Sequence, residues 1–347
     1  MTAPPASSGC TATASLHPVS VTPRTTWLLV KRGEGWGELS DIPQDEAARL
    51  LTSTDRLPDT FAGRTVAGGL ATAAADAMAR AADLPLADWL AARTGKEVTR
   101  RTVPLYANIN RAVRARTPTS AAETAARAVA AGYDTVKIAP WDGLTGPDRV
   151  AEGLRLARAT REAIGDERHL LLDCHHLLTV DELLDHAEEL AELRLGWLED
   201  TAMLDDPDGL RAVREATRTP LAGGEFAASE SEVLPALRSG ALDVLMPDVK
   251  HAAGPLQVLR LADLAARYGI AVSLHNPSGP VATAASAHLS ALLPSTSPPL
   301  ETMFGEVEWR AATVSPPEPL TAATYSLGPR SGIGVTPTAH ARTGVAS

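Results

Sequence analysis

Apolar and polar positions repeat regularly along the chain from residue 103 onward, where a short apolar run is followed by an amphipathic helical stretch, again and again. The runs are nearly continuous in apolar residues, which is typical of parallel strands buried on both faces. Seven strand–helix repeats and a final strand predict a (β/α)8 barrel, with a doubly wound sheet as the alternative. The runs are VPLYANI (103–109), YDTVKIA (133–139), HLLLDCHH (169–176), LGWLED (195–200), PLAGGE (220–225), LDVLMPD (242–248), IAVSLHN (270–276) and PLETMF (299–304).

The part of the chain before residue 100 has a different pattern, which predicts a small α+β unit. Its helical and strand-like stretches are mixed and are not arranged as strand–helix repeats. Strand-like runs are expected at about 10–18, 25–32 and 35–39, and helices at about 44–53 and 66–93.

These patterns divide the chain into three parts. Residues 1–100 are expected to form an N-terminal α+β capping domain, in which residues 1–9, rich in Pro, Ser and Ala, are disordered. Residues 101–306 are expected to form the barrel. Residues 307–347 contain GPRSGIGV and are expected to return to the small domain before a loose end.

Carboxylates stand at the ends of three consecutive runs, where a barrel of parallel strands opens on its catalytic face. Because Asp173, Glu199 and Glu225 are separated by one repeat each, a barrel places them side by side. Three carboxylates within reach of each other repel strongly unless a cation neutralises them. Oxygen ligands with room for water and substrate suit Mg²⁺, so these acids are predicted to bind it. Helix caps and surface acids are the alternative interpretation.

Other runs also end in groups that can carry chemistry. Lys137 ends the second run, Asp248 the sixth and His275 the seventh, and Glu301 lies on the eighth. A histidine held by an aspartate has a fixed tautomer and a raised basicity, so His275 with Asp248 fits a general base. A buried structural pair is the alternative for these two residues.

The composition of the chain excludes some classes of protein and favours a cytoplasmic one. The chain has 347 residues with a net charge of -10, which argues against a nucleic-acid surface. Its two cysteines, Cys10 and Cys174, form no disulfide framework and fit a reducing compartment, so we expect a cytoplasmic protein. No signal peptide and no membrane span are expected, because no basic segment precedes an apolar run at the N-terminus and no apolar run is long enough.

Several segments resemble the enolase superfamily, in its mandelate racemase-like subgroup, and the resemblance covers nearly the whole chain. GWGE (35–38) and SGIGV (331–335) resemble the capping-domain signatures of the family. The barrel segments that carry the resemblance are VKIA (136–139), LLLDCHH (170–176), WLED (197–200), GGE (223–225), MPDVKHAAG (246–254) and SLHNPSGPVATAASAHL (273–289).

The resemblance implies a capping domain on a barrel, and Mg²⁺ that stabilises an enediolate made by removing the proton α to a carboxylate. It implies Asp173, Glu199 and Glu225 as the metal ligands, and His275, oriented by Asp248, as the general base or acid. A small-molecule carboxylate substrate and a homo-oligomer are also implied.

Lys137 is placed to add positive charge where the substrate carboxylate gains negative charge. Glu301 is expected to help hold and polarise that carboxylate together with Lys137. Glu306 is a rival for the Glu301 role, because FGE also falls near the eighth strand end.

Two features of the second and third runs distinguish this chain within the family. Ala139 stands where relatives commonly have a second lysine, which disfavours a racemase that uses that lysine as a base. Asp173 is followed by His175, which resembles the Asp-x-His of some acid-sugar dehydratases and predicts that His175 protonates a leaving β-hydroxyl. Strand alternation would place both on one side, and a merely polar loop residue is the alternative. His176 and Cys174 are expected to be structural.

The capping domain is expected to have a short lid. Only SVTPR separates its first strand from TTWLLVKRG, so a second specificity loop must come from about 56–65. A short lid predicts an open pocket, a larger substrate or closure by a neighbouring subunit. From their positions after the first two barrel strands, Asn108, Arg111 and Trp141 are expected to contact substrate.

Three functions are compatible with these residues. The first is a Mg²⁺-dependent dehydratase of an α-hydroxy carboxylate, such as a sugar acid, giving a 2-keto-3-deoxy acid. The second is a racemase or epimerase with His175 and His275 on opposite faces of the substrate. The third is a non-catalytic relative that kept the barrel and lost the chemistry.

Overall fold

Each of the eight apolar runs contains a short strand. The computed structural model describes residues 14–23, 25–53 and 56–339, so the predicted disorder of residues 1–9 lies outside the described residues. The barrel strands are β4 (Thr102–Asn108), β5 (Thr135–Ile138), β6 (His169–Asp173), β7 (Trp197–Glu199), β8 (Leu221–Gly223), β9 (Val244–Leu245), β10 (Ala271–Val272) and β11 (Leu300–Met303).

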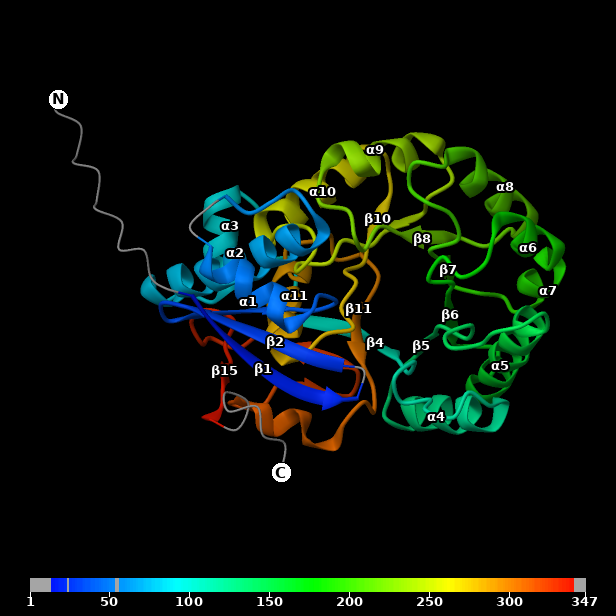
Figure 1. Cartoon of the computed structure of the whole chain (residues 1–347), viewed down its shortest axis with the longest axis horizontal. Helices are drawn as coiled ribbons and strands as arrows, with labels where there is room; N and C mark the ends of the chain where they lie inside the picture. Colours follow the sequence, from blue (N-terminus) through cyan, green and yellow to red (C-terminus); the bar gives the residue numbers. More distant parts are fainter. Residues whose placement is uncertain (1–13, 24, 54–55, 340–347) are drawn as a thin grey trace.

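These strands form a curved parallel sheet that closes on itself (Figure 1). Each strand from β4 to β9 pairs in parallel with the next one along the chain, and β11 pairs in parallel with β4. Hydrogen bonds that involve side chains link the segment after β10 to the segment around β11. Ser273 Oγ donates to the Pro299 carbonyl, and the Asn276 N–H donates to Glu301 Oε2, both at 2.8 Å. Because β11 returns to β4, the barrel prediction is confirmed and the doubly wound alternative is wrong.

Helices follow the strands and cover the outside of the barrel (Figure 1). Their starts match local signals: Thr117 caps α4 just before Pro118, and Thr179 and Glu182 form a capping box at α6. The helices are α4 (Pro118–Ala130), α5 (Arg149–Ile164), α6 (Val180–Asp185), α7 (Ala187–Glu192), α8 (Pro207–Thr217), α9 (Glu230–Ser239), α10 (Pro255–Arg267) and α11 (Pro280–Ser290).

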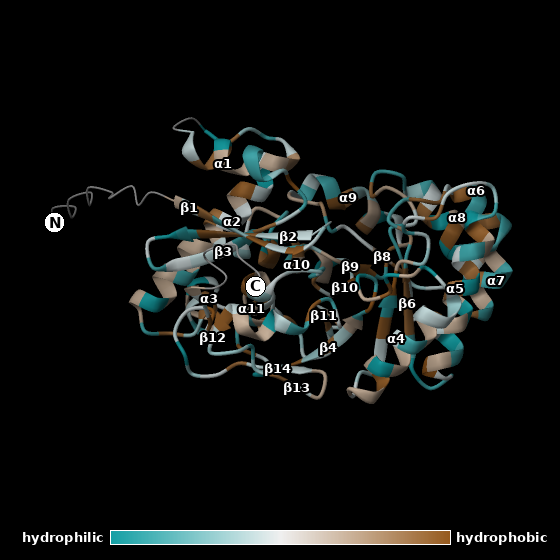
Figure 2. Cartoon of the chain, turned by 60° about the horizontal axis from the view of Figure 1, so that its bottom comes forward, coloured by the Kyte–Doolittle hydropathy of each residue, from teal (hydrophilic) through white to brown (hydrophobic). Residues whose placement is uncertain are grey.

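Alternation along the strands decides which side chains reach the barrel centre. Leu170 and Leu172 of β6 pack in the core between strands and helices, whereas Leu171 packs inside the barrel. Asp173 has the parity of Leu171 and therefore faces the interior at the strand end. Figure 2 shows β6 as mostly hydrophobic along its length. The interior cluster below the strand ends consists of Tyr106, Leu171, Trp197, Ala222, Val244 and Met246.

The N-terminal part is an antiparallel three-stranded sheet packed against helices. The predicted helix at 66–93 is two helices, because the chain turns at Asp83, with φ 52°, before Pro85 begins the next segment. Among the described residues, the predicted first strand starts at Ala14 and runs on to Thr22. The elements are β1 (Ala14–Thr22), β2 (Thr25–Arg32), β3 (Gly35–Leu39), α1 (Gln44–Thr52), α2 (Phe61–Ala81) and α3 (Leu86–Thr94).

The C-terminal segment contacts the N-terminal helices. The Leu86 N–H donates to the Gly332 carbonyl, and the Ile333 N–H donates to Asp76 Oδ1, both at 2.7 Å. The domain limits at residues 100 and 306 stay predictions. In the part of the chain that the structure describes, no helix has the length and apolarity needed to cross a membrane. The remaining elements are η1 (Glu308–Thr313), β12 (Val314–Ser315), β13 (Leu320–Thr321), β14 (Thr324–Ser326) and β15 (Thr336–Pro337).

Candidate active site

Three carboxylates meet at the C-terminal ends of β6, β7 and β8. Asp173 and Glu199 are the last residues of their strands and are direct neighbours in the sheet, and Glu225 follows β8 after Gly224. All three side chains are buried, and one oxygen from each lies within 4.8 Å of the other two. The structure thus brings together the three residues predicted as metal ligands.

This acidic centre fits a divalent cation. Asp173 Oδ2 and Glu225 Oε2 are buried and accept no hydrogen bond of good geometry from the described residues. Burial and the charge of Asp173 raise the pKa of Glu199 to about 8. Buried like charges of this kind need a compensating cation, and carboxylate oxygens are the ligands that hard divalent metals prefer. The donor set is therefore able to hold a divalent metal.

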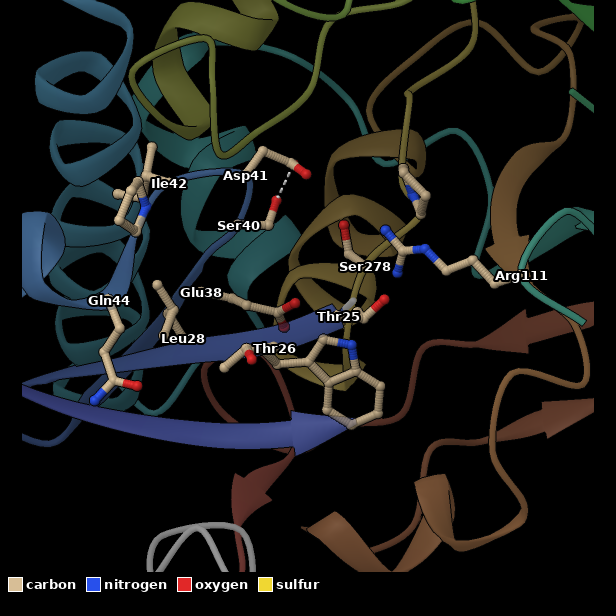
Figure 3. Close-up of a pocket in the computed structure, with 13 residues that line it drawn as sticks. Thr25, Thr26, Leu28, Glu38, Ser40, Asp41, Ile42, Gln44, Arg111 and Ser278 are labelled. Carbon is tan, nitrogen blue, oxygen red and sulfur yellow. Dashed lines mark hydrogen bonds between the residues drawn. The ribbon is translucent and has the colours of Figure 1, made fainter. Parts of the chain in front are cut away.

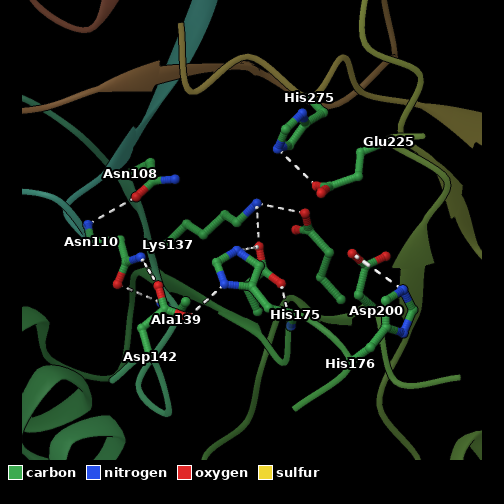
Figure 4. A network of polar contacts seen from close by, with 12 residues as sticks. Asn108, Asn110, Lys137, Ala139, Asp142, His175, His176, Asp200, Glu225 and His275 are labelled. Atoms are coloured by element: carbon green, nitrogen blue, oxygen red, sulfur yellow. Dashed lines mark hydrogen bonds and ion pairs between the residues drawn. The ribbon is translucent and has the colours of Figure 1, made fainter. Parts of the chain in front are cut away.

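Lys137, at the inward-facing position of β5, lies among these acids (Figure 4). Its Nζ is 2.5 Å from Glu199 Oε1, 2.9 Å from Asp173 Oδ2 and 3.2 Å from Glu301 Oε1. Burial acts to lower the pKa of Lys137, but the three carboxylate charges outweigh it and raise that pKa well above its usual value. Lys137 is therefore a fixed positive charge at the edge of the acidic centre.

His275 reaches the centre from the opposite side, through the segment that follows β10 (Figure 4). Its Nε2 is 2.8 Å from Glu225 Oε2, and its Nδ1 is 2.9 Å from Asp248 Oδ2. The same Asp248 oxygen also accepts a hydrogen bond from Lys250 Nζ at 2.5 Å. The predicted His275–Asp248 pair is thus present, with Nε2 directed at the acidic centre and a buried lysine behind it.

His175 also contacts the centre, but not by strand alternation. β6 ends at Asp173, and His175 and His176 have left-handed backbone φ values of 45° and 52°. The turn still brings His175 Nε2 to 3.1 Å from Asp173 Oδ2 and its Nδ1 to 2.6 Å from Asp142 Oδ1. Burial acts to lower the pKa of His175, but the charge of Asp173 and hydrogen bonds to both aspartates raise it to about 12.

Of the two acids near the eighth strand end, the structure places Glu301 at the centre. Glu301 contacts Lys137 and accepts a hydrogen bond from Asn108 Nδ2 at 2.7 Å, so Asn108 also lies at this edge. Glu306 instead pairs with Arg111, whose Nη1 is 2.9 Å from Glu306 Oε1. The rival assignment of Glu306 is not supported by this geometry.

Trp141 does not occupy the expected position. Its side chain is only 2% exposed, and its Nε1 donates to the Val150 carbonyl at 3.3 Å. The indole packs so closely against Gly153 that a side chain there would overlap it. Trp141 is therefore part of the core under α5, and a direct substrate contact is not available to it in this structure.

Cys174 and His176 flank His175 in the sequence, and their side chains lie in the core and beside Asp200. Cys174 is buried in the core between the strands and the helices, as the sequence predicted. His176 turns toward Asp200, with its Nε2 3.7 Å from Asp200 Oδ2 (Figure 4). Its burial lowers the pKa of His176, so it is a neutral imidazole beside the centre.

Sequence reasoning missed four residues at the centre. Asp142 and Asn110 follow the strand ends of β5 and β4, and Lys250 follows Asp248 by two residues. Asp200 is buried, and burial together with the charges of Glu225 and the other ligand acids raises its pKa well above the usual value. Asp200 and Lys250 lie in the segments WLED and MPDVKHAAG that carry the family resemblance, whereas Asp142 and Asn110 offered only a position after a strand end, which many loop residues share.

A cavity of about 370 Å³ lies between the capping strands and the barrel (Figure 3). β1 ends at Thr22 and pairs directly with Thr25 of β2, so the predicted short lid is present. At the second predicted loop, the Phe61 ring lies 5.4 Å from that of Phe226, just after Glu225. The cavity is lined by Thr25, Thr26, Trp27, Leu28, Glu38, Ser40, Asp41, Ile42, Pro43, Gln44, Arg111, Pro277 and Ser278.

Comparison with known proteins agrees with this geometry. The family described as "Enolase C-terminal domain-like" matches residues 120–341, more than half of the chain. The chain belongs to this family. Its fold also matches solved members of the enolase superfamily. A mandelate racemase/muconate lactonizing enzyme from Jannaschia sp. CCS1 has a TM-score of 0.80 at 22% identity, covering 95% of this chain and 96% of that chain.

Among sequence relatives, this enolase-superfamily chain is similar to acid-sugar dehydratases. It is 31% identical over 225 residues to a D-gluconate dehydratase of Thermoproteus tenax, covering 63% of this chain and 45% of the relative. It is 32% identical over 191 residues to a D-xylonate dehydratase of Haloferax volcanii, covering 52% and 46%. The chain thus matches less than half the length of these relatives.

Proposed function

We propose that this protein is a Mg²⁺-dependent dehydratase of a sugar acid that gives a 2-keto-3-deoxy acid. The observation that carries the proposal is the pair of histidines on opposite sides of one acidic centre. His275 is held by Asp248 and His175 by Asp142, and each directs its Nε2 to a ligand carboxylate. One base and one acid around a metal centre are the set that dehydration needs.

The metal would be held by Asp173, Glu199 and Glu225, and when bound it would supply Lewis-acid stabilisation of charge on the substrate carboxylate. Lys137 adds a second positive charge beside that carboxylate, and Glu301 keeps Lys137 in place through their 3.2 Å contact. Because Lys137 is buried and held by three acids, it needs no reorganisation when negative charge develops.

The proton steps belong to the two histidines. His275 Nε2 accepts the α-proton, and the electron pair of the C–H bond passes into the substrate as an enediolate. His175 Nε2–H protonates the β-hydroxyl, so that the C–O bond breaks and water leaves. The enol product then takes up a proton and becomes the 2-keto-3-deoxy acid, with no change in overall oxidation state.

The substrate class follows from the relatives and the cavity. The relatives are named for D-gluconate and D-xylonate, open-chain sugar acids with one carboxylate. The cavity between the capping strands and the barrel has a polar lining that includes Thr25, Ser40 and Gln44, which suits a polyhydroxy chain. Arg111 reaches into it near Ser278 (Figure 3). In this proposal Asn108 and Arg111 orient the substrate between the carboxylate site and the cavity.

The test is a screen of sugar acids and simple 2-hydroxy acids with Mg²⁺ in D₂O, read by a 2-keto-acid assay and by mass. Wild type is expected to give a 2-keto-3-deoxy acid, and His275→Asn to lose at least 10²-fold in rate, as expected for removal of a general base. The control is His186→Asn, a surface histidine paired with Glu189, which should keep full activity.

Other results separate the alternatives. Deuterium at Cα without keto acid would replace the dehydratase by a racemase or epimerase, which the two opposed histidines also permit. No product and no Mg²⁺ binding by calorimetry would leave a non-catalytic relative. Equal activity of His275→Asn and wild type would overturn the assignment of the base.

A further inference from the structure

The loop after β5 carries Asp142, an aspartate that contacts His175 but has no assigned role of its own in the proposed reaction. Asp142 Oδ1 lies 2.6 Å from His175 Nδ1, and Asp142 Oδ2 accepts a hydrogen bond from Asn110 Nδ2 at 2.6 Å. Arg116 approaches the same Oδ2 at 3.6 Å. Both oxygens of this carboxylate are therefore engaged, and its orientation is determined.

Asn110, the partner of Asp142, is itself held on several sides. Its Oδ1 accepts hydrogen bonds from Arg116 Nη1 at 2.7 Å and from the Ala139 N–H at 3.3 Å. Its own N–H donates to Asn108 Oδ1 at 2.8 Å, and Asn108 in turn donates to Glu301. A chain of hydrogen bonds thus connects the eighth strand end to His175 across the ends of β4 and β5, and Figure 4 shows its part from Asn108 to His175.

This arrangement determines which nitrogen of His175 faces the chemistry. A carboxylate beside Nδ1 accepts the Nδ1 proton, which leaves Nε2 as the nitrogen that gains and loses a proton. That Nε2 lies 3.1 Å from Asp173 Oδ2, at the metal centre. His275 has the same geometry on the other side, with Asp248 at Nδ1 and Glu225 at Nε2. The two Asp–His pairs differ in the strands that carry them.

We propose that Asp142 is the positioning residue of His175, and that this second Asp–His pair serves the departure of water but not the removal of the α-proton. The inference rests on the proposed function. In the step itself, the His175 Nε2–H bond breaks, the proton goes to the β-hydroxyl oxygen, and the C–O bond breaks as water leaves. Asp142 keeps its own charge and touches no substrate atom.

Because the two histidines serve different steps, a change at Asp142 should slow the loss of water without slowing the removal of the α-proton. Asp142→Asn keeps the size of the side chain but removes the charged carboxylate that accepts a hydrogen bond from His175 Nδ1–H. Dehydration is expected to fall by roughly 10²-fold, the usual contribution of a general acid. Proton removal by His275 continues, so deuterium from D₂O appears at Cα of recovered substrate, and the ratio of exchange to dehydration rises by a similar factor.

Two further measurements exclude a general loss of structure. Mg²⁺ affinity by calorimetry should be unchanged, because Asp142 is not among the three clustered carboxylates. Nitrogen-15 NMR of His175 should show a strong Nδ1–H hydrogen bond to the Asp142 carboxylate in wild type and its weakening in the variant. If Asp142→Asn does not fold, Asn110→Ala, which removes the other hold on Asp142, should shift the exchange-to-dehydration ratio in the same direction.

An equal fall in exchange and dehydration, or an unchanged Nδ1–H hydrogen bond of His175, would overturn the inference while leaving the dehydratase in place. Failure of the proposed function is a separate result, in which wild type itself yields no keto acid from any acid in the screen.

Discussion

At the scale of single residues, the buried charges at this site share partners and do not form isolated pairs. Asp248 shows this clearly, because its Oδ2 accepts hydrogen bonds from both His275 and Lys250, and its Oδ1 accepts one from the Lys250 N–H. Burial acts to raise the pKa of Asp248, but the charges of Lys250 and His251 and the contact with His275 together outweigh it and lower that pKa far below the usual value. Lys250 thus helps keep the partner of His275 ionised.

Replacing Lys250 by methionine should therefore destabilise the protein strongly. Lys250 is 1% exposed, and its loss leaves Asp248 with an uncompensated buried charge. Breaking one partner of a buried pair costs about 3–5 kcal/mol, which urea unfolding measures directly. Lys96→Met is the matched control, since Lys96 pairs with the half-exposed Asp263 and such surface pairs contribute about 0–1 kcal/mol. Similar losses in both variants would refute the role of Lys250.

At the scale of elements, the capping helix α2 meets the barrel through a position without a side chain. Gly68 of α2 is buried, and a Cβ there would lie 2.0 Å from the carbonyl oxygen of Lys250, in the loop that carries Asp248. The capping domain thus rests directly on the loop that carries Asp248, the partner of His275. Its strand β3 also approaches α2 closely, since a Cβ on Gly37 would lie 2.0 Å from the Gly69 carbonyl.

The Gly68→Ala substitution tests this contact, because helix propensity predicts a more stable protein and packing predicts a less stable one. Propensity alone would stabilise the helix by about 1 kcal/mol. The overlap with the Lys250 backbone should reverse this and destabilise the protein by about 1–3 kcal/mol. Thermal unfolding measures the sign, and Gly328→Ala, where a Cβ meets nothing within 4 Å, should be nearly neutral. A more stable Gly68→Ala protein would show that α2 moves freely over the loop.

At the scale of the whole molecule, the acidic centre joins three consecutive strands of the barrel, so cation binding should stabilise the fold. The pKa of Glu199 is raised to about 8 from an ordinary 4.5, so this acid keeps its proton to higher pH in the metal-free folded protein than in the unfolded chain. Between these two pH values the unfolded chain has lost a proton that the folded protein still binds, so the metal-free protein becomes less stable as pH rises. A bound cation reverses this, because it requires the carboxylate form.

Mg²⁺ binding should therefore release a proton and weaken about tenfold for each pH unit below 8, with a plateau above. At 100 times the dissociation constant, Mg²⁺ should raise the free energy of unfolding by about 2.7 kcal/mol. Calorimetry in two buffers of different ionisation enthalpy measures how many protons are released when Mg²⁺ binds. Unfolding with and without Mg²⁺ at pH 6.5 and 8.5 measures the change in the free energy of unfolding. Equal affinity at both pH values would contradict the assignment, and Glu199→Gln should abolish the proton release.

The sequence by itself determined the barrel and the grouping of three carboxylates at its strand ends, since a repeat that spans one strand and one helix forces successive strand ends to be neighbours. That is why Asp173, Glu199 and Glu225 could be grouped before any coordinates were considered. Metal identity, cytoplasmic location and homo-oligomeric state stay predictions.

Only the tertiary structure decided which loop residues join the centre. Trp141 and Asp142 are adjacent in the same loop, yet one packs under α5 and the other holds His175. His175 itself reaches Asp173 through a left-handed turn that strand alternation does not predict. The physical reason is that strand ends follow the periodicity of the local pattern, whereas loop side chains follow contacts between segments far apart in the chain.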